Sequence, residues 1–137
     1  MTKEEAYILL GAPRGCENKI RRLEVTIDEL KSCLLPGAIR YDTDHVQTTP
    51  KDKMAELYAR IDELERELET ERIKKRDAII EIDRAIHKLP ETKEKTVLAE
   101  YYIGRMTIPK IAEGIGVSVR HCHRLKQNGF KMFLEVN

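Results

Sequence analysis

The C-terminal third of the chain concentrates arginine, lysine, histidine and amide side chains at helical spacing. The stretch from residue 117 to residue 134 has no aspartate or glutamate, so a helix there would present a positive face. Arginine can donate two hydrogen bonds to guanine, and glutamine can pair with adenine. We expect base-edge contacts from Arg120, His121, His123, Arg124 and Gln127, and phosphate contacts from Arg105, Lys110, Ser118, Lys126 and Lys131.

The same region has the residues of two short helices joined by a tight turn. Thr107 can cap the first helix, and Pro109 is tolerated in its first turn because the amides there have no partner within the helix. Gly116 accepts the positive φ that ends a helix, and Ser118 can cap the next one. These features predict a helix-turn-helix that holds the positive helix outward. Its inward side consists of Ile111, Ala112, Ile115, Val117, Cys122 and Leu125.

Charge is distributed unevenly, although the net charge is only +1. Residues 91–137 carry 8 lysines and arginines against 5 aspartates and glutamates, whereas residues 1–90 carry 17 against 19. Thr92 can cap a supporting helix that ends before Gly104. We therefore expect residues 90–137 to form a DNA-binding domain whose partner is double-stranded DNA.

The N-terminal part begins with a predicted short helix. Thr2 and Glu5 have the spacing of a capping box, so the helix should cover Lys3–Leu10 and stop at the breaker Gly11–Pro13. From Cys16 to Leu35 the apolar residues then alternate at spacings of three and four, which is typical of a coiled-coil seam. The seam residues are Ile20, Leu23, Ile27, Leu30 and Leu34.

A longer helix is predicted from Lys51 to Leu89. Its seam starts at Met54, Leu57, Ile61, Leu64 and Leu68 and resumes at Ile79, Ile82, Ile86 and Leu89. Charged residues interrupt it between 69 and 77, so we expect a register shift or a change of packing partner there. The loop 36–50 should pack partly on the coil through Ile39, Tyr41 and Val46, and a disordered linker is the alternative.

These elements predict an all-α protein with a long antiparallel helical hairpin at residues 1–89, followed by the helix-turn-helix domain. The predicted helix Cys16–Leu35 is about half as long as the predicted helix Lys51–Leu89, so it can cover only about half of that helix. The surface from Ile79 to Leu89 should therefore pack on the C-terminal domain or on a second copy. Because a lone two-helix hairpin buries little area, we expect a homo-oligomer, with a dimer favoured.

Composition argues against several classes of protein. No segment approaches the roughly 20 consecutive apolar residues that span a bilayer, and the start lacks the order of a signal peptide, so we expect no membrane contact and a cytoplasmic location. Three widely spaced cysteines predict free thiols rather than a disulfide.

We also expect no metal, no cofactor and no enzymatic activity. His121, Cys122 and His123 are consecutive, and consecutive residues on a helix point about 100° apart, so they cannot converge on one ion. The sequence shows no glycine-rich phosphate loop and no arrangement of a nucleophile with a base, which leaves no catalytic residue to assign.

The region from about Leu89 to Leu134 resembles the region-four helix-turn-helix of sigma-70-type factors, because IAEGIGVS matches the IAxxLGxS core of that motif. The whole chain resembles small sigma-like late transcription regulators of phages and prophages of Gram-positive bacteria, including its opening TKEEAYILL and the stretch AEYYIGRMTIPKIAE. The resemblance implies a phage origin, activation of late genes and RNA polymerase of the host as a partner.

Two glycines depart from the sigma pattern. Gly114 and Gly129 each cost about 1 kcal/mol relative to alanine inside a helix, and Asn128 with Gly129 is a candidate early end of the recognition helix. Two other functions fit parts of the sequence. A phage small terminase subunit also joins a helix-turn-helix to an oligomerising coil, and a coiled-coil adaptor would bind protein without touching nucleic acid.

Overall fold

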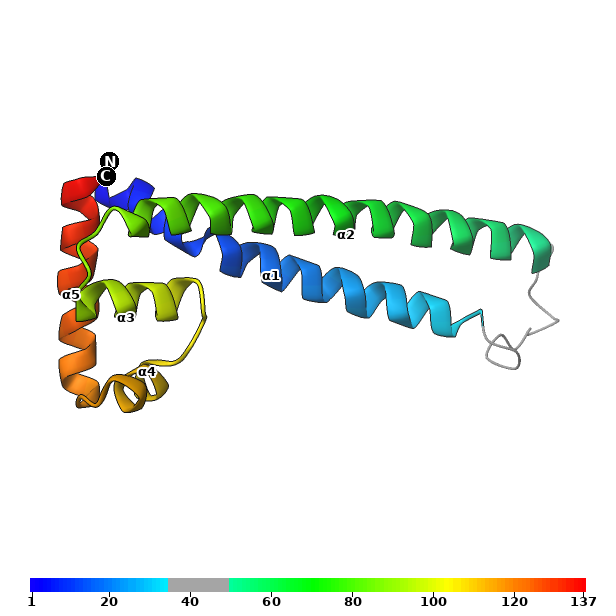
Figure 1. Ribbon diagram of the computed structural model, residues 1–137. Helices are drawn as coiled ribbons and strands as arrows, with labels where there is room; N and C mark the ends of the chain where they lie inside the picture. The colour runs from blue at the N-terminus through cyan, green and yellow to red at the C-terminus, as the bar shows by residue number, and fades with distance from the viewer. Residues whose placement is uncertain (35–49) are drawn as a thin grey trace. The chain divides into compact units, whose positions relative to one another are not determined.

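The computed structural model describes residues 1–34 and 50–137 of the chain, with the side chains of the second range described from Asp52 onward. Every regular element in these residues is a helix, which confirms the all-α prediction. The predicted packing of Ile39, Tyr41 and Val46 lies outside the described residues. The helices are α1 (Lys3–Ser32), α2 (Pro50–His87), α3 (Lys93–Tyr102), α4 (Ile108–Ile115) and α5 (Val119–Val136), as Figure 1 shows.

Contacts divide the chain into two compact units. One unit combines Met1–Gly15 with Lys74–Asn137, and the other is Cys16–Ile73. This grouping differs from the predicted division at residue 89, because the first turns of α1 and the last turns of α2 pack with the C-terminal helices.

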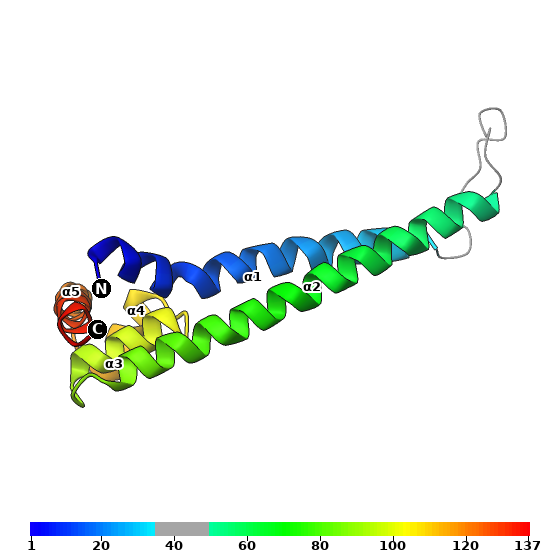
Figure 2. The same ribbon diagram turned by 90° about the horizontal axis from the view of Figure 1, so that it is seen from above.

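The unit Cys16–Ile73 is an antiparallel pair formed by parts of α1 and α2, which lie side by side in Figures 1 and 2. Lys19 pairs with Glu71 at 3.2 Å and Lys31 with Glu65 at 2.9 Å. The Lys31–Glu65 pair is exposed and contributes little, whereas Glu71 is buried, and the cost of taking its carboxylate out of water offsets much of its attraction to Lys19. The apolar seam therefore supplies most of the stabilisation. The predicted seam is confirmed by its buried residues, Ile20, Leu23, Ile27, Ile61, Leu64 and Leu68.

The prediction of two separate N-terminal helices is wrong. The capping box is present, since Thr2 N donates to Glu5 Oε2 at 2.8 Å and Glu5 N donates to Thr2 Oγ1 at 3.2 Å. However, α1 continues through Pro13 to Ser32 instead of stopping at the breaker. A proline inside a helix loses one backbone hydrogen bond. Here the side chain of Pro13 is fully buried, and we attribute the tolerance of the helix to that packing.

The predicted change of partner between residues 69 and 77 is confirmed. Leu68 packs in the seam of the antiparallel pair, whereas Ile82 packs in a different cluster with Leu10 of α1 and Phe133 of α5. The surface from Ile79 to Leu89 was expected to pack on the C-terminal domain or on a second copy. Of these two alternatives the structure shows the first, since Ile82, Ile86 and Leu89 are buried against the chain's own helices. The first turns of α1 contribute to this cover, because they supply Ala6 and Leu10 to the cluster.

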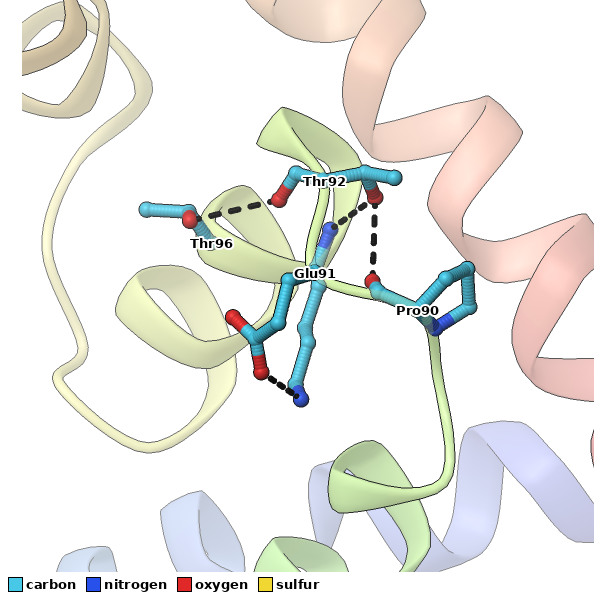
Figure 3. Close-up of polar contacts among 5 residues, drawn as sticks. Pro90, Glu91, Thr92 and Thr96 are labelled. Carbon is cyan, nitrogen blue, oxygen red and sulfur yellow. Dashed lines mark hydrogen bonds and ion pairs between the residues drawn. The ribbon is translucent and has the colours of Figure 1, made fainter.

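The start of α3 is fixed by the predicted threonine cap. Figure 3 shows the polar contacts around Thr92, whose hydroxyl donates to Pro90 O at 3.4 Å and accepts from the backbone amide of Lys95. The hydroxyl of Thr96 donates to Thr92 O at 3.3 Å. The cap orients α3, against which both later helices pack.

Candidate nucleic-acid interface

The helices α3, α4 and α5 share one apolar core within their unit. Val97 of α3 and Cys122 of α5 are fully buried, and Ala112 of α4 is nearly so. Because α4 packs on both other helices, it fixes the direction in which α5 begins. The buried residues of this core are Val97, Ile108, Ile111, Ala112, Cys122 and Leu125, in agreement with the predicted inward residues Ile111, Ala112, Cys122 and Leu125.

The turn between α4 and α5 follows the predicted chemistry. Gly116 ends α4 in the left-handed conformation with φ 73° and ψ 37°, a region that glycine enters without steric cost. The amide of Val117 then donates to Ala112 O at 3.0 Å. Ser118 caps α5, because its hydroxyl accepts a hydrogen bond from His121 N at 3.1 Å. Thr107 stands at the N-cap of α4, but its side chain makes no capping hydrogen bond.

The candidate early end of α5 at Asn128 and Gly129 is not observed, since α5 runs from Val119 to Val136. Gly129 is buried where α5 crosses α3. A β carbon at this position would lie 3.0 Å from Glu94 O and 3.0 Å from Leu98 Cγ. The glycine therefore permits a close helix crossing. Gly114 has no atom within 4 Å of its β-carbon position, so the packing does not require it.

The outer face of α5 presents most of the predicted base-edge residues. The side chains of Arg120, His123, Arg124 and Gln127 are exposed, and that of His121 is half-buried. Within residues 1–34 and 50–137, no hydrogen bond or ion pair joins the side chain of Arg120 or Arg124 to another residue. These two guanidinium groups lie one helical turn apart and are available to a ligand.

The predicted phosphate-contacting residues have varied surroundings. Lys110, Ser118 and Lys131 are exposed, on α4, at the N-cap of α5 and on the C-terminal half of α5. Arg105 is half-buried between α3 and α4 and has a positive φ of 53°. The structure thus brings Ser118 and Lys131 to the helix of the base-edge residues and leaves Arg105 in the connection before α4.

Lys126 differs from the other lysines because its amine lies over an aromatic ring. Its Nζ is 3.8 Å from the centre of the Tyr101 ring, and the guanidinium of Arg14 lies 5.5 Å from the same centre. Burial opposes ionisation of the Tyr101 hydroxyl, but the charges of Lys126 and Arg14 outweigh this effect and lower the pKa of Tyr101. The two cations hold α1 and α5 around one residue of α3.

The structure adds residues of α1 that the sequence patterns did not suggest. Tyr7 stacks on Phe130 with ring centres 4.5 Å apart, and Lys3 lines a groove of about 420 Å³ beside α5. Lys3 and Tyr7 share a helix face at a spacing of four, and this was the only indication in the sequence. The sequence does not show that this face of α1 lies against α5, because α5 is far away along the chain.

Clusters of candidate metal ligands and membrane-spanning helices are absent from the part of the chain that is described. Within it, no group of three or more histidine, cysteine, aspartate or glutamate residues could hold a metal ion. Cys122 lies in the core, where burial raises the pKa of its thiol. Across the described ranges, no helix is both long and apolar enough to cross a membrane.

Comparison with known proteins gives one family and no named relative. No curated protein and no solved structure matches the chain. A protein family described as "protein of unknown function (DUF1492)" matches residues 37–133. This match covers more than half of the chain and includes α3, α4 and most of α5. The chain therefore belongs to the DUF1492 family.

Proposed function

We propose that the chain binds double-stranded DNA in a sequence-dependent manner and regulates transcription. In this proposal α4, the turn at Gly116 and α5 act as a helix-turn-helix, with α5 entering the major groove. The observation that carries the proposal is the exposed face of α5. It presents Arg120 and Arg124 without a partner among the described residues and includes no acidic side chain from residue 117 to residue 134.

The spacing of the two arginines fits the geometry of a duplex. Residues four apart on a helix are separated by about 6 Å along its axis. Base pairs follow one another at about 3.4 Å, so the two side chains would reach bases about two steps apart. Arg120 lies in the first turn of α5, and the N-terminal turns of a recognition helix are those that meet base edges.

Backbone contacts would come from both sides of this arginine pair. Lys110 extends from α4, the helix that crosses the DNA backbone in this kind of motif. Lys131 lies on α5 almost two turns beyond Arg124. The hydroxyl of Ser118 already accepts a hydrogen bond as the cap of α5. A phosphate near Ser118 would therefore be bound mainly by the free backbone amides at the start of α5.

The regulatory part of the proposal rests on resemblance. The stretch IAEGIGVS is similar to the region-four motif of sigma-70-type factors, and the chain as a whole is similar to small late-gene regulators of phages. By that resemblance the protein would act on late promoters in a bacterial cytoplasm, with host RNA polymerase as a partner. A homodimer remains part of this proposal. The apolar residues Ile82, Ile86 and Leu89 do not argue for it, because they are buried within the chain itself.

The test is a titration of the full chain against random-sequence duplexes at several salt concentrations, read by fluorescence anisotropy. The affinity should fall as salt rises, because each neutralised phosphate releases counterions. The double variant Arg120→Ala with Arg124→Ala should bind random duplexes more weakly, because two positive charges leave the face that meets the DNA, and it should lose more affinity on a preferred sequence. The matched control is Arg21→Ala with Arg22→Ala, which removes the same charge from exposed positions of α1.

The control variant should bind almost like the unmodified chain. Two results would contradict the proposal. One is the absence of binding to any duplex at low salt, which is the behaviour of a protein-binding adaptor. The other is an equal loss of affinity in both double variants, which would mean that only overall charge matters.

A further inference from the structure

A groove runs along α5 from His123 to Leu134, beside the first turns of α1. Its volume is about 420 Å³. Residues from three helices of the same unit form its walls. They are Lys3 and Tyr7 of α1, Tyr102 of α3, and His123, Lys126, Gln127, Phe130, Lys131 and Leu134 of α5.

The charge of the groove favours an anion. Lys3, Lys126 and Lys131 are cationic, and none of the described residues that line the groove is acidic. Hydroxyl and amide groups from Tyr7, Tyr102 and Gln127 add uncharged hydrogen-bond donors. Lysines and such donors are the groups that proteins use on the phosphates and sugars of DNA.

The position of Lys3 is set by packing rather than by a free chain end. Ala6 and Leu10 are almost completely buried with Phe130 and Phe133, and the ring of Tyr7 stacks on Phe130. Lys3 itself stands in the first helical turn after the Thr2 cap. A positive charge at the N-terminus of a helix interacts unfavourably with the helix dipole, so Lys3 does not serve to stabilise α1.

We propose that this groove receives the sugar-phosphate backbone of DNA next to the bases that α5 contacts. The first turn of α1 would then be part of the DNA interface. This inference rests on the proposed function and extends it to a second helix. The groove is continuous with the base-reading face because His123 and Gln127 belong to both. An acidic peptide would meet the same charges but would have no reason to follow that face.

The first experiment replaces Lys3 with glutamine and measures affinity for duplex DNA against salt. Losing one phosphate contact should reduce the slope of log K against log salt by about 0.9 and weaken all duplexes alike. Lys53→Gln, an exposed lysine of α2 in the other unit, is the matched control and should change neither quantity. Unfolding does not explain a loss in Lys3→Gln, because removing this cation favours the helix.

The second experiment measures the reactivity of each lysine toward acetylation, with and without duplex, by mass spectrometry. Duplex should protect Lys3 and Lys131 and leave Lys53 unchanged. Equal reactivity of Lys3 in both states, with Lys131 protected, would overturn the inference while leaving the proposed function intact. Unaltered affinity and salt slope in Lys3→Gln would overturn it as well. If the unmodified chain binds no duplex at all, both proposals are wrong.

Discussion

A β carbon on Gly129 would lie 3.0 Å from the carbonyl oxygen of Glu94, so α5 crosses α3 at a distance that suits glycine. Backbone atoms cannot give way as the end of a flexible side chain can. Leu98, whose Cγ would be equally close, is fully buried and also has little room to move. Gly129 lowers the helix propensity of α5, but it also allows α5 to pack closely against α3.

The first prediction concerns this crossing. Gly129→Ala should lower the free energy of unfolding by about 1 to 2 kcal/mol, since overpacking outweighs the gain in helix propensity. Gly114→Ala is the matched control on α4, where a β carbon would meet no atom within 4 Å. It should raise stability by up to about 1 kcal/mol. Urea denaturation measures both, and a stabilised Gly129→Ala variant would contradict the close crossing.

The second prediction separates the two caps of the candidate helix-turn-helix. Ser118→Ala should cost about 1 kcal/mol of stability, because the amide of His121 loses its hydrogen bond at the start of α5. Thr107→Ala should cost much less, since the side chain of Thr107 makes no capping bond. Thermal unfolding of the two variants gives the comparison. Equal losses would mean that the capping of α5 is not specific to Ser118.

The third prediction tests whether the end of α2 is covered by its own chain. Ile82 is 0% exposed, and Ile82→Ala should reduce the free energy of unfolding by roughly 2 to 5 kcal/mol. Ile80 is 42% exposed, and Ile80→Ala should cost less than about 1 kcal/mol. Denaturation at two protein concentrations measures both effects. If Ile82→Ala lowered the free energy of unfolding only at the protein concentration at which the chain associates, Ile82 would be buried by a second copy instead.

The fourth prediction distinguishes base reading from phosphate contact on α5. Arg124→Ala should weaken specific binding by roughly 1 to 3 kcal/mol and relax the preference at one base pair. Lys131→Ala should weaken specific and random duplexes about equally. Competition titrations with both kinds of duplex supply the measurement. Equal losses on specific and random DNA for Arg124→Ala would remove its assignment to a base edge.

Local patterns in the sequence were sufficient for much of the fold. Alternating spacings of three and four marked the seam around Leu23 and Leu64, and the caps at Thr92 and Ser118 set the starts of α3 and α5. These features depend on residues near one another in the chain. For the same reason, the turn at Gly116 could be predicted with its left-handed conformation.

The errors arose where distant segments decide the outcome. The local sequence predicts a helix end at Pro13, because the burial of this proline in a core built by other helices cannot be seen there. The local sequence makes Gly129 a candidate helix end for the same reason, since its partner Leu98 lies far away along the chain. In the candidate site, Lys3 and Tyr7 were missed because nothing nearby indicates that α1 reaches α5.

The most direct test of the account is selection of bound duplexes from a random-sequence library by the full chain, followed by sequencing. We expect enrichment of a short motif containing guanine. Arg124→Ala should lose the preference at one position of that motif and retain the rest. Recovery of duplexes with the same sequence distribution as the starting library, or no recovery at all, would contradict the claim that α5 reads DNA.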